Sequence, residues 1–299
     1  MKINLFINDY VPVYQRKLNQ TNTLKNISLE LVKKIYRPEH TYVLRGEPTE
    51  HPKFRELLDI FTEKNYILMT EASKLSSLIG YQGEIPYISF SYDGFQNDQI
   101  RGNRNLTYNV MKALEHFSQK DTQLRIEYII SQNNYEWFEI DVVILKKLMS
   151  LYPKMKQPYY VLFQEGDYFK KKDFTWVPLT EQAVLRANAL GVLTQKNLDF
   201  LKAYLERKEY SCIALKDEII VMSDGTVRLC LSHKFNEIIG DINSSTLEDI
   251  ISSTQPIRDA CVGCEYKLSC WLAYHYKESI YQLEEQKRST LIQENKLLT

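Results

Sequence analysis

The sequence predicts an α/β protein in which a mostly parallel sheet precedes a small cysteine-rich module. Over the first two hundred residues, short β-rich runs alternate with segments of helical periodicity, which is the pattern of β-α-β units. All five cysteines lie in the last third of the chain, and none precedes Cys212. Of the 299 residues, 44% are hydrophobic, which is enough for one large domain and one small one to bury cores.

The six predicted strands are short runs rich in β-branched and aromatic residues, at residues 2–7, 41–44, 66–70, 87–91, 125–131 and 159–163. Amphipathic helices are predicted between them at residues 24–35, 54–64, 106–117 and 138–151. Each crossover is expected to be right-handed, and ligands of such folds sit at the carboxyl ends of the strands. Periodicity alone leaves open whether the sheet curls into an open barrel or stays flat and doubly wound.

Two more helical segments are predicted after the strands. One covers residues 180–208, with a break at Gly191, and the other is the tail from 271 to 298. No repeat or low-complexity linker separates the two parts of the chain. We place the domain boundary near residue 208, so that residues 1–208 form the sheet domain and residues 209–299 the cysteine module with its terminal helix.

The first two cysteines flank a predicted hairpin. The β-rich runs 219–222 and 226–229 surround a turn that contains Gly225, and pairing of the two runs brings Cys212 and Cys230 near each other. The other three form a knuckle in which a Cys-x2-Cys pair lets two thiolates converge on one metal. The candidate metal ligands are therefore Cys212, Cys230, Cys261, Cys264 and Cys270.

The cysteines allow other interpretations. Free cysteines also occur as small buried hydrophobes. A disulfide framework is disfavoured because the count is odd and the chain opens with no secretory signal peptide, so we expect a cytoplasmic protein with reduced thiols. Spacing alone does not decide between iron-sulfur and zinc, since both accept four thiolates. His233 and His275 are alternative ligands near the module, whereas His116 is assigned to packing or surface.

Charge and hydropathy exclude two classes of partner. The chain has 38 basic and 38 acidic residues, and nothing in that balance predicts binding to nucleic acid or to an anionic membrane surface. No apolar run approaches the roughly 18 residues needed to span a bilayer. We therefore expect a soluble protein.

The cysteine spacing, Cys-x12-Gly-x4-Cys and then Cys-x2-Cys-x5-Cys, resembles the SPASM domain over about residues 212–271. That family continues with further cysteines, but Tyr274 stands where the next one is expected and none follows Cys270. All-thiolate ligation then allows one cluster at most. The resemblance to the single-cluster twitch arrangement implies one 4Fe-4S cluster, with Cys270 spare or an alternative to the fourth of the ligands Cys212, Cys230, Cys261 and Cys264.

Upstream, the resemblance extends to the radical SAM fold and favours a partial (β/α)6 barrel. Residues 44–52 resemble the Gly-Gly-Glu-Pro loop, which in that family binds the amino group of S-adenosylmethionine (AdoMet). Residues 88–94 and 100–102 resemble the fourth-strand region, and residues 128–134 resemble the end of the fifth strand. The resemblance implies a vestigial cofactor loop at Gly46, Glu47 and Pro48. Gly46 permits the turn and Pro48 stiffens it. Alternatively, Glu47 merely pairs with Arg45 on the surface.

The Cys-x3-Cys-x2-Cys loop that defines the radical SAM family is expected after the first strand. This chain has no cysteine there, and the oxygen donors of residues 6–15 suit iron-sulfur iron poorly. We therefore expect no standard radical SAM chemistry. Whether AdoMet still binds without reacting stays open at this point.

Three functions remain. The chain resembles SPASM-domain peptide maturases that lack the radical SAM cysteines and accompany ATP-grasp ligases, which implies a pseudoenzyme that recognises a precursor peptide or the ligase in ribosomal peptide (RiPP) modification. The second function is an enzyme of unknown reaction at the barrel mouth, with Glu47, Asp93, Arg101 and Arg125 as polar candidates. The third is a scaffold whose cysteines hold zinc, since a metal knuckle stabilises local folding.

Overall fold

A computed structural model gives the structure of the chain, and it describes residues 1–9, 24–130, 134–156, 158–162, 189–191, 218–228 and 238–254. Its centre is a nine-stranded sheet with the order β6-β5-β4-β3-β2-β1-β7-β8-β9. The first six strands are parallel, as predicted. They are β1 (Lys2–Phe6), β2 (Thr41–Arg45), β3 (Tyr66–Thr70), β4 (Tyr87–Ser91), β5 (Gln123–Ile130) and β6 (Tyr159–Leu162).

Three further strands extend the sheet beyond β1. β7 (Glu218–Val221) runs parallel to β1, and β8 (Thr226–Arg228) and β9 (Ile238–Asp241) follow antiparallel. The predicted hairpin is confirmed: its turn closes through a bond from the Met222 amide to the Thr226 carbonyl, 2.8 Å, and Gly225 adopts φ +91°. The sheet thus includes strands from both predicted domains, while the boundary near residue 208 lies outside the described residues and stays a prediction.

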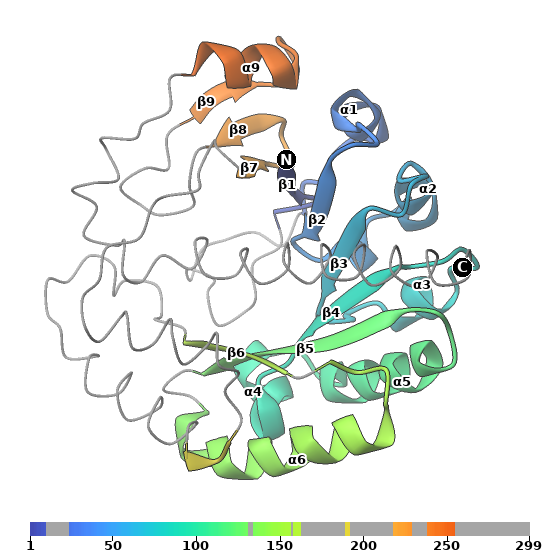
Figure 1. Cartoon of the computed structure of the whole chain (residues 1–299), viewed down its shortest axis with the longest axis vertical. Coiled ribbons are helices and arrows are strands. Elements are labelled where there is room, and N and C mark those ends of the chain that lie inside the picture. The colour runs from blue at the N-terminus through green and yellow to red at the C-terminus, as the bar shows by residue number, and fades with distance from the viewer. Residues whose placement is uncertain are drawn as a thin grey trace, which may run out of the picture.

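The helices connect the parallel strands. They are α1 (Leu29–Ile35), α2 (Phe54–Asp59), α3 (Leu75–Ile79), α4 (Asn97–Arg101), α5 (Leu106–Ser118) and α6 (Phe138–Leu151), and α9 (Leu247–Ser253) follows β9. Three short 3-10 turns lie beside the strand ends: η2 (Pro48–Glu50), η3 (Gly94–Gln96) and η4 (Tyr135–Trp137). Figure 1 shows α1, α2, α3, α5 and α6 along one side of the strands. No helix in the described part of the chain is long and apolar enough to cross a membrane.

Two predicted helices are shorter than expected. α1 begins at Leu29 because the Ser28 hydroxyl accepts the Leu31 amide as an N-cap, while Ile27 is held by the Ile7 carbonyl at 2.8 Å. α2 ends at Asp59, and Lys64 adopts φ +50°, which an α-helix does not tolerate. Gly191 has φ +63°, in keeping with the predicted break, but the other residues of 180–208 and those of 271–298 lie outside the described residues.

The two faces of the sheet differ in character, because alternate residues of a strand point to opposite faces. One face is apolar and joins the helices in a single core, to which it contributes Ile3, Leu5, Leu44, Leu68, Phe90 and Ile126. The opposite face, called the polar face below, carries Lys2, Asn4, Arg45, Ser89, Arg125, Glu127 and Glu218. Each of these side chains is nevertheless at most 7% exposed. Buried charges must be paired or hydrogen-bonded. A sheet face that carries several of them is therefore a candidate for a functional site.

Candidate functional site

Polar side chains gather where the parallel strands end. Asn8 follows β1, Glu47 follows β2, Glu71 follows β3 and Asp93 follows β4, and all four are buried. Arg101, the last residue of α4, is buried beside them, and Gly102 ends that helix with φ +63°. Carboxyl ends of parallel strands share one edge of a sheet, so these groups form a single candidate site. The structure therefore brings the predicted residues Glu47, Asp93 and Arg101 to the same edge.

The centre of the site is an arginine bridge, formed by Arg101 with Glu71 and Asp93. Arg101 Nη1 donates to Glu71 Oε2 at 2.8 Å, and Arg101 Nε lies 2.8 Å from Asp93 Oδ2. All three side chains are 3% exposed. In the part of the chain that the structure describes, Asp93 Oδ1 is a buried atom without a hydrogen-bond partner. The bridge therefore holds two carboxylates with one guanidinium.

Electrostatics in the bridge are set mainly by burial. Burial raises the pKa of Asp93, and the Arg101 guanidinium opposes the rise. Burial likewise raises the pKa of Glu71, where Arg101 again acts against it and the Asp93 charge adds to it. Burial therefore raises the pKa of both carboxyls, and the shared arginine limits the rise.

The predicted cofactor loop lies next to the bridge. Gly46 adopts φ +80°, and Pro48 is the first residue of η2, as the turn requires. The Glu47 carboxylate is fully buried and accepts three hydrogen bonds: from the Thr49 hydroxyl, from Thr70 Oγ1 at 2.5 Å and from the Glu71 amide at 2.8 Å. Burial raises the pKa of Glu47, and these donors oppose it.

The alternative in which Glu47 pairs with Arg45 on the surface is wrong, because both side chains are buried. Arg45 instead points along the polar face, where its Nε donates to Asn4 Oδ1 at 2.9 Å. Asn4 Nδ2 in turn donates to Glu218 of β7. Asn4 therefore connects the strand before the cofactor loop with the first strand of the C-terminal hairpin.

The rest of the polar face is a mixture of cations and anions. Burial lowers the pKa of Lys2, with the Glu218 charge opposing it. Burial raises the pKa of Glu127, and Arg45, Arg125 and Arg101 oppose the rise. Arg125, the fourth predicted polar candidate, packs over the Tyr87 ring at 5.4 Å, on the polar face rather than in the arginine bridge.

Sequence reasoning missed Glu71, Asn8 and Glu127. A signal for the polar face was present: polar and apolar residues alternate in β1 and in β5. Strands of a parallel sheet are usually apolar on both faces, so this alternation indicates a polar interior surface.

The candidate metal ligands cannot be placed. All five cysteines, together with His233 and His275, lie outside the described residues. Within the described ranges, no group of three or more His, Cys, Asp or Glu side chains is arranged to hold a metal ion. What the structure does provide is the β7–β8 hairpin, which lies between Cys212 and Cys230 in the sequence.

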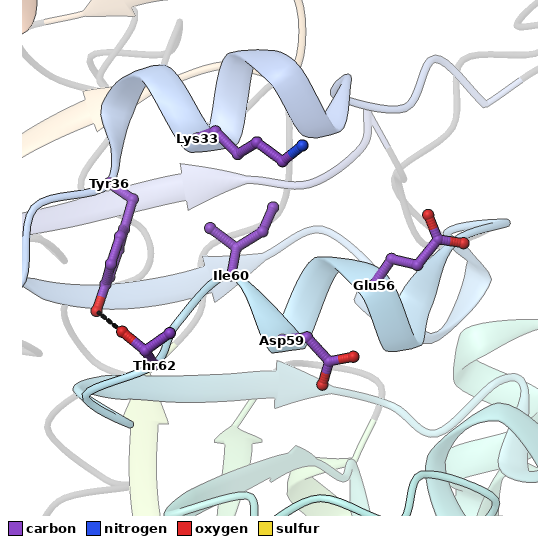
Figure 2. A pocket seen from close by; sticks show the side chains of 6 residues that line it. All are labelled: Lys33, Tyr36, Glu56, Asp59, Ile60 and Thr62. Atoms are coloured by element: carbon purple, nitrogen blue, oxygen red, sulfur yellow. Dashed lines mark hydrogen bonds between the residues drawn. The ribbon is translucent and has the colours of Figure 1, made fainter.

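A surface groove lies on the helical side of the sheet, between α1 and α2 (Figure 2). Its volume is about 530 Å³, and it is lined by Lys33, Tyr36, Glu56, Asp59, Ile60 and Thr62. The Tyr36 and Thr62 hydroxyls are 3.2 Å apart at one end. Lys33 pairs with Glu30 at 2.8 Å, so the charge of the lysine is already balanced. The groove is open and mixed in character, and it lies on the opposite side of the sheet from the polar face.

Comparison with known proteins supports the interpretation of the cysteine spacing and that of the fold. Residues 212–271 match the SPASM family model, an iron-sulfur cluster-binding domain, which confirms the resemblance seen in the cysteine spacing and supports an iron-sulfur cluster in this region. No curated protein matches the chain.

The fold is similar to solved structures of anSMEcpe. Native anSMEcpe with bound AdoMet is 15% identical, with 90% of this chain and 88% of that chain covered and a TM-score of 0.57. Native anSMEcpe with bound AdoMet and Kp18Cys peptide is 16% identical, with the same coverage and a TM-score of 0.56. At such identity the similarity shows the fold alone. The chain therefore has a radical SAM/SPASM-like α/β fold, with a match to the SPASM domain over residues 212–271.

Proposed function

We propose that this protein is a cluster-bearing component of ribosomal peptide modification, which recognises a precursor peptide or a partner enzyme and performs no standard radical SAM chemistry. One observation carries the proposal. The chain matches an iron-sulfur cluster-binding domain over residues 212–271, yet it has no cysteine before Cys212 to hold a second cluster at the carboxyl edge of the sheet.

The proposed cluster is of the 4Fe-4S type. Its ligands are Cys212, Cys230, Cys261 and Cys264, with Cys270 as a spare or alternative fourth ligand. Thiolates are the usual donors for such clusters, and the β7–β8 hairpin lies between Cys212 and Cys230 in the sequence. A bound cluster supplies electron transfer or local order; zinc at the same thiolates would supply order alone.

The proposed partners are a precursor peptide and an ATP-grasp ligase. A solved structure of similar fold contains a peptide together with AdoMet, which supports peptide modification as the process. The charged groups of the polar face are not open to such a peptide, because their side chains are at most 7% exposed.

The first test is the metal content of anaerobically purified protein. We expect about four irons and four sulfides per chain, and a lower iron content in Cys212→Ala and Cys264→Ala than in a matched Cys270→Ala control. A finding of one zinc and no iron would mean that the site is structural and holds no cluster. Unchanged iron in the first two variants would mean that the ligands are wrongly assigned.

The second test addresses the chemistry and the peptide. Dithionite-reduced protein incubated with AdoMet is expected to form no 5′-deoxyadenosine above a protein-free control. A displayed library of random peptides is expected to be enriched for one sequence pattern by the wild-type protein and not by Cys264→Ala. Formation of 5′-deoxyadenosine, or no enrichment by the wild-type protein, would contradict the proposal.

An enzyme of unidentified reaction at the carboxyl edge is the second candidate. Two buried oxygens favour it, Asp93 Oδ1 after β4 and Ser89 Oγ within β4, and neither has a hydrogen-bond partner in the described part of the chain. Buried polar atoms of this kind are often satisfied by a ligand or an ordered water. A thermal shift with a panel of amino acids and amines, lost in Asp93→Asn, would support this candidate; no shift with any member would count against it.

A further inference from the structure

The carboxyl edge contains one arrangement that the proposed function does not use: the side chain of Asn8 is bound to the backbone of the loop after β2. We propose that Asn8 closes the loop formed by Gly46, Glu47 and Pro48, so that this loop does not accept AdoMet. The inference is independent of the proposed function, because a peptide-recognition component is possible with or without a non-reacting AdoMet.

Asn8 makes a two-point contact with Glu47. The Glu47 amide donates to Asn8 Oδ1 at 2.8 Å, and Asn8 Nδ2 donates to the Glu47 carbonyl at 2.8 Å. Both residues are fully buried. The carboxamide therefore satisfies the donor and the acceptor that the backbone of residue 47 has to offer, in the way that a neighbouring peptide group would.

The space beside the glycine is also filled. Gly46 has φ +80°, and a Cβ atom added to it would lie 2.5 Å from Asn8 Oδ1 and 2.6 Å from the Asn8 carbonyl oxygen. A glycine is needed here because Asn8 packs directly against the bare backbone. A glycine loop can let a ligand approach the backbone closely, but here Asn8 occupies that space.

The side chains of the loop are engaged as well. The Glu47 carboxylate accepts from Thr49, Thr70 and the Glu71 amide, so its charge is solvated from within the protein. Arg45, which precedes the loop, is directed to Asn4 on the polar face. A ligand ammonium group would have to displace these internal donors in order to reach the carboxylate.

Asn8 is fixed in this position by the main chain on both sides. The Ile7 amide donates to the Arg45 carbonyl at 2.9 Å, and the Ile27 amide donates to the Ile7 carbonyl at 2.8 Å. Asn8 itself forms an antiparallel bridge with Asn26. Asn8 is therefore held in place between the loop after β2 and the segment before α1.

The test combines AdoMet titration with hydrogen exchange of the Glu47 amide. In the wild-type protein we expect no saturable heat with AdoMet up to about 1 mM and no effect of AdoMet on Glu47 exchange. In Asn8→Ala, exchange of this amide should be faster by about tenfold or more, because its acceptor is gone. Asn26→Ala is the matched control, since Asn26 contacts Asn8 but not this amide, and should leave the exchange unchanged.

Asn8→Asp serves if Asn8→Ala does not fold. It keeps an oxygen as the acceptor of the Glu47 amide and removes the donor to the Glu47 carbonyl, so the amide should stay protected. Saturable AdoMet binding that slows or speeds Glu47 exchange in the wild-type protein would overturn the proposal. Unchanged Glu47 exchange in Asn8→Ala would overturn it equally.

Discussion

Replacing Arg101 by methionine tests whether the arginine bridge stabilises the carboxyl edge. The substitution removes a cation that lies 2.8 Å from a carboxylate oxygen of Glu71 and 2.8 Å from one of Asp93, whose side chains are 3% exposed. Removing one partner of a buried ion pair costs about 3–5 kcal/mol, because the other charge is left uncompensated. Two carboxylates lose their partner here, so we expect a loss of at least about 3 kcal/mol at pH 7.5.

The loss should depend on pH with a definite sign. Burial already raises the pKa of both carboxyls, and Arg101 acts against it, so removing the arginine raises both values further. A carboxyl whose pKa is higher in the folded state than in the unfolded state binds more protons when folded. Stability then falls as pH rises through the window above the unfolded pKa of about 4. The Arg101→Met protein should therefore regain stability as the pH is lowered from 7.5 towards 5.

Thermal unfolding at pH 5.5 and 7.5 measures both effects. With roughly 2–4 °C per kcal/mol for chains of this size class, the melting temperature at pH 7.5 should fall by at least about 6 °C. Arg37→Met is the matched control: Arg37 pairs with Glu248 at 3.0 Å on the surface, and such exposed pairs contribute about 0–1 kcal/mol. Equal losses in the two variants, or a loss in Arg101→Met that is the same at both pH values, would refute the reasoning.

Two further substitutions probe the loops after the strands. Gly94→Ala should cost about 2 kcal/mol or more in a urea titration, because Gly94 has φ +83° and the new Cβ would lie 2.0 Å from Asp141 Oδ2. Gly191→Ala, with φ +63° and no atom of the described residues within 4 Å of the new Cβ, should cost only about 1 kcal/mol in the same titration. Thr70→Val should cost about 1–3 kcal/mol by removing a donor to the buried Glu47 carboxylate. Since that donor lowers the pKa of Glu47, the loss should be larger at pH 7.5 than at pH 5, and a pH-independent loss would contradict this account.

Much of the fold was predictable from local pattern. β3 and β4 have the bounds expected from their β-rich runs, and α6 has those expected from its periodicity. The short helices α3 and α4 were missed, since five residues are too few for a helical period to be recognised. The parallel pairing of β7 with β1 was also missed, because long-range strand pairing leaves no local signal.

The candidate site was predictable in part. Asp93 and Arg101 were singled out as polar residues near strand ends, but Glu71, which completes their bridge, follows β3 directly and reads as an ordinary loop residue. Glu47 was expected to face a ligand, but its carboxylate accepts hydrogen bonds from Thr49 and Thr70 within the protein. Sequence spacing does not reveal which groups a buried carboxylate contacts. The ligand set of the cysteines rests on resemblance alone and stays a prediction.

The position of β1 between β2 and β7 has a consequence for folding during synthesis. β1 is synthesised well before its partner on one side, β7, because 214 residues separate the two residues of the Asn4–Glu218 contact. Until that partner leaves the ribosome, one edge of β1 has no β7 to pair with, and such edges invite association with other chains. Contacts of such high sequence separation also form slowly. A nascent chain that ends before residue 218 should therefore depend on chaperones more than the completed chain does.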